Sequence, residues 1–382
     1  MPLRVVDSVV RDVIVPAMIR IAQMLGQTLV VAWLNVGSGQ GVAGRFTIWD
    51  GHYYAQLARS GYPFGITVDT SQTAGSGSEL AFSPLYPWIT SLTHAGLGLG
   101  VDTALLVVSS LSGCTFAVLV HLIVRANGHS RRAGYLACWL IGVLPMAVVL
   151  QMGYAESLYA ALSAAAVLAA TRRRWVAAGV LTFLAGWTRS TGYVTAAGVG
   201  VMGIAARRDE RHGGPSLRLL AAVTTLGLSG TPLFWLFIAA HTGHLAGWFE
   251  VERNGWGTRF DAGRSTAHFL RTTLTHPSAG SFAAVIVALI LLGAVAVVVS
   301  LANGRELAYF TLGVLTVATV FGSTNYWHSK PRLLLTAALI VIPLAYRLRE
   351  STLVRIIPVL VFSFLASAWF GAYMITQWPY AI

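Results

Sequence analysis

The chain has 382 residues, of which 55% are hydrophobic and only 10% are charged, and its mean hydropathy is +0.67. Soluble domains carry about 25% charged residues, so this composition excludes a soluble globular protein. Long apolar runs occupy more than half of the sequence. We therefore expect an all-α, polytopic integral membrane protein with one domain over residues 1–382, rather than two or three soluble domains.

The formal net charge is +12 at pH 7, and arginine supplies all but one of the 26 basic residues, the exception being Lys330. In a soluble protein such a charge would suggest a nucleic-acid partner. Here the position of the charges matters more than their sum, and we expect no nucleic-acid partner. We interpret the arginine bias as the coding composition of a GC-rich genome rather than as chemistry. The expected location is a bacterial plasma membrane.

Apolar stretches bounded by Arg, Gly, Pro or polar clusters predict about eleven membrane-spanning helices. They lie at residues 15–36, 103–124, 133–152, 156–171, 175–188, 190–206, 217–240, 281–302, 306–323, 332–346 and 353–374. Most basic residues fall in segments on the side of the N-terminus, so the positive-inside rule predicts a cytoplasmic N-terminus. The two long polar connections, residues 37–100 and 241–280, then both lie outside, and long loops of this kind are usually functional. We expect short interfacial helices in the first of them.

Three of these helices are too short to cross a hydrocarbon core of about 30 Å. They lie between Glu156 and Arg172, between Arg174 and Arg189, and between Arg332 and Arg347. Because arginines anchor the inner ends, the shortfall is expected at the outer ends, at Glu156, Arg189 and Arg332. Charges at that depth are tolerated where they face one another or a polar cavity, which predicts an outward-opening pocket. The alternative is local thinning of the bilayer, with each side chain reaching the interface alone.

The first outer loop contains the segment FTIWDGHYYAQLARSGYPF, residues 46–64, followed by AFSPLYP, residues 81–87. Asp50 follows the first span directly, where a carboxylate can meet lipid-borne substrates. The neighbouring aromatic residues suit the headgroup layer or the face of a sugar. Asp50 could equally be the N-cap of a helix over residues 51–59. The residues alone leave both interpretations open.

These motifs resemble those of the PIG-V-like mannosyltransferases, relatives of the GPI second mannosyltransferase in the GT-C class of membrane glycosyltransferases. The resemblance covers most of the chain. It is carried by Trp49-Asp50-Gly51, Gly61-Tyr62, Phe82 to Pro87, Pro145, Tyr154 to Leu158, Trp175, Ala178-Gly179, Thr188 to Gly192 and Ser329 to Arg332. The chain departs from the family pattern at Ser83, where the family more often has Phe.

The resemblance implies a GT-C-like fold and the transfer of mannose from a polyprenyl-phosphate-mannose donor on the non-cytoplasmic face. The acceptor would be a lipid-linked or surface glycan, and its identity does not carry over. The catalytic aspartate of the family's first loop maps onto Asp50.

For such a transfer we expect an inverting single displacement, in which Asp50 accepts the proton of the acceptor hydroxyl. The departing phosphate needs fixed positive charge. The candidates for it on the outer side are His328, Arg332, Lys330 and Arg189. Arg189 could instead form a structural ion pair with Glu156. Trp49, His52, Tyr53, Glu156 and Tyr86 are expected to support the pocket.

The second outer loop contains Trp248, Glu250, Glu252, Arg253 and Trp256, which either bind acceptor or sugar or form a solvated loop of mixed charge. No DxD motif occurs, and His241 and His244 lack a neighbouring carboxylate or Cys, so we expect no metal and no cofactor.

Two non-enzymatic interpretations remain. A lipid or glycan transporter, or flippase, of the cell envelope would explain the spans and the pocket equally well, although transporters usually show internal repeats and none is evident here. A non-catalytic scaffold of a cell-envelope complex would make no special demand on Asp50.

Overall fold

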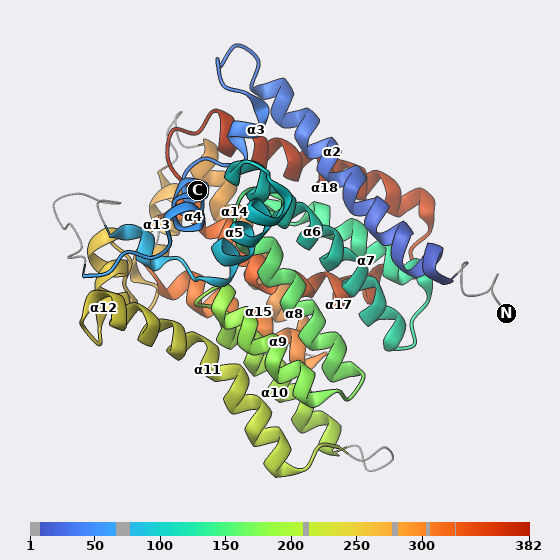
Figure 1. Cartoon of the computed structure of the whole chain (residues 1–382). Coiled ribbons are helices and arrows are strands. Elements are labelled where there is room, and N and C mark those ends of the chain that lie inside the picture. Colours follow the sequence, from blue (N-terminus) through green and yellow to red (C-terminus); the bar gives the residue numbers. More distant parts are fainter. Residues whose placement is uncertain (1–7, 66–76, 209–213, 277–281, 303–305, 325) are drawn as a thin grey trace.

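The computed structural model describes residues 8–65, 77–208, 214–276, 282–302, 306–324 and 326–382, and these ranges are helical, without a named strand (Figure 1). In the labels below, η marks a short 3₁₀ or π turn. The bundle consists of η1 (Val10–Ile14), α2 (Val15–Leu34), α6 (Val101–Ala126), α7 (Arg131–Val143), η3 (Ala147–Gln151), α8 (Glu156–Thr171), α9 (Trp175–Thr188), α10 (Gly192–Arg208), α11 (Leu217–Thr242), α14 (Phe282–Leu301), α15 (Leu307–Gly322), η5 (Trp327–Ser329), α16 (Lys330–Leu333), η6 (Leu334–Ile340), α17 (Val341–Leu348) and α18 (Leu353–Thr376).

The two long connections contain shorter helices. The first holds α3 (Val42–Arg45), α4 (Asp50–Ser60), η2 (Ser78–Ala81) and α5 (Leu85–Leu97), and the second holds α12 (Gly247–Glu250), η4 (Val251–Gly255) and α13 (Arg264–Thr275). Residues 66–76 and 277–280 of the two expected loops lie outside the described residues. The helices of both connections gather at the end of the bundle that also holds the C-terminal residues, while the start of the first described helix lies at the other end (Figure 1).

Each of the eleven expected ranges contains a helix, and six helices of the described ranges are long and apolar enough to cross a membrane. These six are Val10–Leu34, Val101–Ala126, Leu217–Thr242, Phe282–Leu301, Trp327–Leu348 and Leu353–Thr376. The chain is thus a multi-pass membrane protein. The expected count of about eleven crossings is not established, because α8, α9 and α15 are apolar but shorter.

The span expected over residues 332–346 is wrong in its outer boundary. The helical run begins at Trp327 and continues for 22 residues to Leu348. Pro331 lies in the first turn of α16. Backbone N–H groups in that turn have no carbonyl partner within the helix, so the N–H that proline lacks is not missed and Pro331 does not end the run. Ala337, with φ −97° and ψ 25°, interrupts the regular helix within η6. Arg332 therefore lies inside the run rather than at its outer end.

Small residues let neighbouring helices approach closely, as is common in membrane bundles. Gly230 of α11 faces α9, and a Cβ added at Gly230 would lie 2.5 Å from the carbonyl oxygen of Phe183. We expect Gly230→Ala to destabilise the protein by about 1–3 kcal/mol, because the obstructing atom is backbone and cannot move aside. Thermal unfolding in detergent measures this effect. The matched control is Gly293→Ala in α14, where nothing lies within 4 Å; an equal loss in both variants would contradict the steric explanation.

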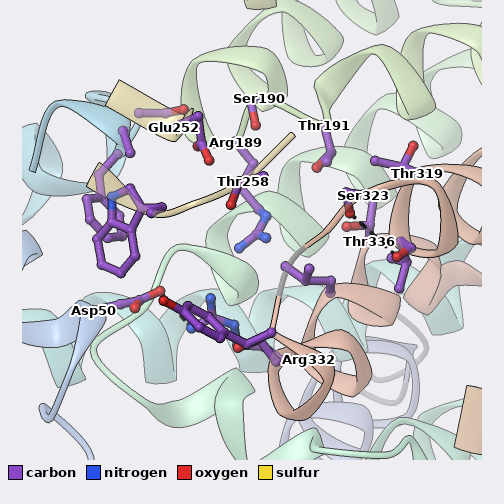
Figure 2. A pocket seen from close by; sticks show the side chains of 18 of the residues that line it. Asp50, Arg189, Ser190, Thr191, Glu252, Thr258, Thr319, Ser323, Arg332 and Thr336 are labelled. Carbon is purple, nitrogen blue, oxygen red and sulfur yellow. Dashed lines mark hydrogen bonds and ion pairs between the residues drawn. The ribbon is translucent and has the colours of Figure 1, made fainter. Parts of the chain in front are cut away.

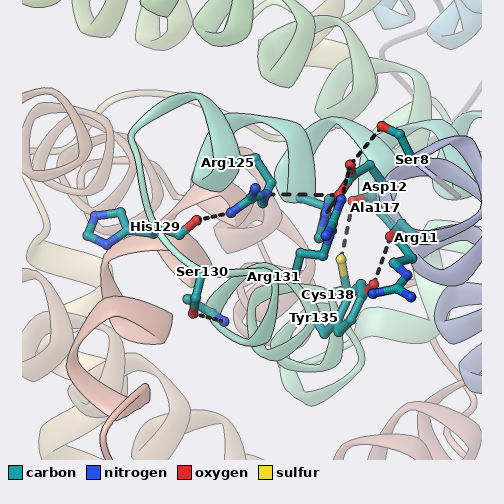
Figure 3. A network of polar contacts seen from close by, with 12 residues as sticks. Ser8, Arg11, Asp12, Ala117, Arg125, His129, Ser130, Arg131, Tyr135 and Cys138 are labelled. Carbon is teal, nitrogen blue, oxygen red and sulfur yellow. Dashed lines mark hydrogen bonds and ion pairs between the residues drawn. The ribbon is translucent and has the colours of Figure 1, made fainter. Parts of the chain in front are cut away.

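A polar network joins the first helix to the rest of the bundle at the end opposite to the long connections (Figure 3). Asp12 of η1 accepts hydrogen bonds from Arg131 Nε and Nη2, at 3.0 and 3.1 Å, and lies 3.0 Å from His121 Nε2 of α6. Tyr135 donates a 2.8 Å bond to the carbonyl of Arg11. The network joins the N-terminal end of the first helix to α6 and α7.

Candidate active site

Asp50 is held by an unusual backbone conformation. Trp49, which precedes it, has φ 52° and ψ −111°, a region that a bulky residue enters only at a cost of about 1–3 kcal/mol. A helix is present where expected, but it begins one residue earlier: α4 starts at Asp50, its N-cap is Trp49, and no side chain caps it. The interpretation of Asp50 as the N-cap is therefore wrong. The side chain of Asp50 is only 12% exposed and faces the bundle rather than the solvent.

The carboxylate of Asp50 meets a guanidinium that is 282 residues away in sequence. Arg332 Nη1 donates a hydrogen bond of 2.6 Å to Asp50 Oδ2, and Arg332 Nε lies 3.4 Å from Glu156 Oε1. Arg189 Nη1 lies 2.6 Å from the same oxygen of Glu156. We call Asp50, Glu156, Arg189 and Arg332 the buried charge cluster. The ring of Tyr154 packs against the guanidinium of Arg332, with its centroid 5.1 Å from Arg332 Cζ.

The cluster follows from how the short helices pair. Glu156 is the first residue of α8, and Arg189 caps the end of α9, so an antiparallel hairpin brings the two charges to the same end. The expected alternative pairing of Arg189 with Glu156 is confirmed. Each of the two carboxylates is matched by one guanidinium, which offsets the cost of removing these charges from water.

The buried charge cluster lies on the wall of a cavity of about 540 Å³. Asp50, Arg189 and Arg332 line it directly (Figure 2). Glu156 contacts both arginines but is not among the residues that line the cavity. The second long connection forms one side, and α10, α15 and η6 form the other. The charges at Glu156, Arg189 and Arg332 are therefore gathered beside one cavity instead of reaching the surface separately. The short helices predicted this meeting for Glu156 and Arg189, whereas Arg332 joins it from inside a longer helical run.

Aromatic residues tie the second connection to the first beside the cavity. Trp256 donates a 2.9 Å hydrogen bond from Nε1 to the carbonyl of Ser78, and its ring meets Tyr53 edge-on at 5.4 Å. Tyr53 in turn stacks on Phe82 at 5.4 Å. Trp248 also lines the cavity. Trp248, Glu252, Arg253 and Trp256 of this loop line the cavity, whereas Glu250 does not. Binding of acceptor or sugar by this loop stays a prediction.

Glu252 lines the same cavity from η4, opposite Asp50 (Figure 2). Burial raises the pKa of Glu252 to about 7, and the negative charge of Asp50 adds to the shift, while a hydrogen bond with Thr258 opposes it. Besides Asp50, the cavity thus holds a carboxyl group with a pKa of about 7.

Two of the expected phosphate ligands do not face the cavity. Lys330 Nζ donates 2.7 Å hydrogen bonds to the carbonyls of Val320 and Ser323, and so it caps the end of α15. His328 stacks on Tyr326 and Tyr380, at 5.4 and 6.0 Å. The structure gives both side chains packing roles beside the site.

Some of the residues expected to support the pocket lie at the site, and others do not. Tyr53 belongs to the aromatic wall and Glu156 to the buried charge cluster, and Trp49 sets the backbone before Asp50. His52 is exposed. Tyr86 lies in the core, where its hydroxyl bonds to the carbonyl of Leu105 at 3.0 Å and to Ser109 at 2.7 Å.

Several residues that line the cavity were not expected from the sequence. Arg259 is an exposed cation at the cavity. Arg253 is another, and it belongs to the second-loop set for which both interpretations were open. A row of hydroxyl side chains lines the opposite side: Thr191, Thr316, Thr319, Ser323 and Thr336. Isolated Ser and Thr in apolar helices carry no signal in one sequence, because their hydroxyls commonly bond to the backbone of their own helix.

Across the described ranges, no three His, Cys, Asp or Glu side chains come together as a group that could hold a metal ion. Asp50 and two buried arginines, Arg189 and Arg332, line the cavity next to one another. Such an arrangement can accept a proton and stabilise an anion side by side.

No family model matches the chain, and no curated protein matches it. Among solved structures it is similar to ArnT from Cupriavidus metallidurans in the apo state, with a TM-score of 0.51 and 16% sequence identity over 90% of this chain and 62% of that one. It also aligns with the Archaeoglobus fulgidus oligosaccharyltransferase, in the apo form and tethered with an acceptor peptide, with a TM-score of 0.48, 12% identity, and coverage of 95% of this chain and 56% of that chain.

The chain spans about three-fifths of the length of these structures. The likeness to ArnT shows the fold, and it agrees with the GT-C-like architecture that the motifs implied. The likeness does not show that the chain belongs to the PIG-V-like family, and that membership stays a prediction from the motifs.

Proposed function

We propose that this chain is an inverting glycosyltransferase that moves mannose from polyprenyl-phosphate-mannose to a hydroxyl of a lipid-linked or surface acceptor. One observation carries the proposal: a buried carboxylate, Asp50, lies 2.6 Å from a buried guanidinium, Arg332, at the wall of a cavity of about 540 Å³. A base and an anion-binding group side by side are what a displacement at a sugar phosphate requires. The GT-C-like fold supports the same assignment.

The reaction is a single displacement. The acceptor oxygen gives its proton to Asp50 and forms a bond to the anomeric carbon of the sugar. The bond between that carbon and the phosphate oxygen breaks, and the lipid phosphate leaves with the electron pair. Arg332 and Arg189 supply fixed positive charge to the leaving phosphate. General-base assistance of this type contributes about 10²- to 10⁴-fold to a rate.

The surroundings of Asp50 favour its role as a base. Burial raises the pKa of Asp50 above its ordinary value of 3.8, and Glu156 raises it further, while Arg332 opposes the shift. A carboxylate with a raised pKa accepts a proton more readily than one in water.

The proposal includes a location and partners. The chain acts as one membrane domain over residues 1–382, in a bacterial plasma membrane, with its N-terminus in the cytoplasm and its cavity on the outer face. The distribution of basic residues supports this orientation. Its partners are the donor lipid and a glycan acceptor, and it uses no cofactor.

The test is transfer of radiolabelled mannose from polyprenyl-phosphate-mannose in membranes that contain the protein, against membranes that lack it. We expect label in a new glycolipid or glycan product. If no label were transferred and the protein moved the lipid across the bilayer, the transporter interpretation would replace the enzyme interpretation.

Glu252 predicts a pH dependence of donor binding. Since its pKa is about 7, the carboxyl loses its negative charge as the pH falls from 8 to 6, and the anionic donor meets less repulsion. We expect polyprenyl-phosphate-mannose to bind more tightly at pH 6 than at pH 8. Titration of the lipid in detergent measures this difference. Glu252→Gln is expected to remove it, whereas Glu250→Gln in the neighbouring α12 keeps it; a dependence that persists in Glu252→Gln would assign it to another group.

A further inference from the structure

The part of the cavity wall formed by Thr191, Thr316, Thr319, Ser323 and Thr336, which we call the hydroxyl wall, has no assigned role in the transfer itself. Its residues come from the start of α10, from α15 and its C-terminal end, and from η6. In Figure 2, Arg189 and Arg332 lie between the labelled members of this wall and Asp50. The wall is thus adjacent to the anion-binding arginines, on the side away from the base.

Hydrogen-bonding capacity remains free on this wall. Thr316 is 1% exposed, and its Oγ1 has no partner among the described residues, nor does the buried Oγ1 of Thr191. By contrast, Thr319 already donates a 2.7 Å bond to the carbonyl of Leu315 and shares another with Tyr193. A buried hydroxyl without a partner is costly, so such groups usually point to a ligand or water.

The chemistry of the wall is neutral. The residues of α10, α15 and η6 that line the cavity are hydroxyl or aliphatic side chains, with Val194 and Val320 between the threonines. Each threonine offers a hydroxyl that can donate and accept and a methyl group that packs on C–H groups. A neutral sugar ring presents the same mixture of hydroxyl and C–H groups. An amino sugar or a uronic acid would bring a charge for which this wall has no counterion.

We propose that the hydroxyl wall is the subsite that binds the sugar ring of the donor, and that it selects a neutral hexose. The inference rests on the proposed function, because the phosphate position is taken from Arg189 and Arg332. A phosphate on these two arginines places an attached sugar next to the wall. Thr316 and Thr336 then form hydrogen bonds with sugar hydroxyls.

The experiment compares the affinity of the purified protein for two probes in detergent: polyprenyl-phosphate-mannose, and the same polyprenyl phosphate without the sugar. We expect the wild type to bind the mannosylated lipid more tightly. Thr316→Val keeps the shape of the side chain but removes the hydroxyl, and it should weaken binding of the mannosylated lipid about 3- to 10-fold, the usual effect of one hydrogen bond. Binding of the bare phosphate lipid should not change.

Three further variants complete the test. Thr316→Ser retains the hydroxyl and should bind as the wild type does, while Thr336→Val, on a different element, should repeat the loss and serves if Thr316→Val does not fold. Thr311→Val is the matched control, since Thr311 lies on α15 outside the cavity and bonds to the carbonyl of Leu307. Equal affinity of the wild type for both lipids, or full preference for mannose in both valine variants, would overturn the subsite. A mannose preference without any transfer would leave the subsite standing and reject the proposed function.

Discussion

Replacing Asp50 with asparagine is expected to reduce mannose transfer by about 10²- to 10⁴-fold, the contribution of a general base. Asparagine has nearly the same shape as aspartate and can still accept a hydrogen bond from Arg332, but it cannot take the proton of the acceptor. The loss should therefore appear in kcat rather than in donor affinity. Initial rates with radiolabelled polyprenyl-phosphate-mannose, at several donor concentrations, separate the two.

The control is Asp102→Asn, which alters another acidic residue near the first connection. Asp102 is 60% exposed and pairs only with Arg59 at the surface, at 3.0 Å. It should transfer mannose at the wild-type rate. Full activity of Asp50→Asn, in protein that binds the donor normally, would remove Asp50 from the chemistry and favour the transporter or the scaffold.

Replacing Glu156 with glutamine is expected to destabilise the protein by about 3–5 kcal/mol, the usual effect of removing one partner from a buried ion pair. Glu156 is 4% exposed and is the only carboxylate recorded near Arg189 within the described ranges, so the change leaves that guanidinium without a counterion. Arg332 keeps Asp50. Thermal and chemical unfolding in detergent measure the loss of stability.

Glu350→Gln provides the comparison, because Glu350 is 82% exposed and its pair with Arg349 lies in water. Exposed pairs of this kind contribute little to stability, so this variant should unfold as the wild type does. If Glu156→Gln unfolded at the same point, the buried charge cluster would not be a structural unit.

The helices could be predicted from the sequence because the bilayer demands long apolar runs, and their charged ends mark where such runs stop. The cost of burying charged side chains in the membrane also allowed part of the site to be predicted. Glu156, Arg189 and Arg332 lie too deep for isolated charges, which predicted their meeting at one cavity. What the apolar pattern could not give is the number of crossings, since α8, α9 and α15 are apolar but short.

Proximity in sequence misled the assignment of the phosphate ligands. Lys330 and Arg332 are two residues apart, which in a helix places their side chains on nearly opposite faces. Arg332 therefore reaches Asp50 while Lys330 turns to the end of α15. The hydroxyl wall escaped prediction for a different reason: Thr316 and Thr311 look alike in the sequence, and only the packing of α15 against α10 and η6 distinguishes them.

On the proposed mechanism, Arg332 serves two anions in turn, which links proton transfer to release of the lipid phosphate. Before the reaction it is the counterion of Asp50, and on the proposed mechanism Asp50 becomes neutral at the moment when the lipid phosphate gains negative charge. On this mechanism Arg332 can then pair with the phosphate in place of Asp50. The same exchange would leave the product lipid held until Asp50 gives up its proton, so that product release and resetting of the base are one step.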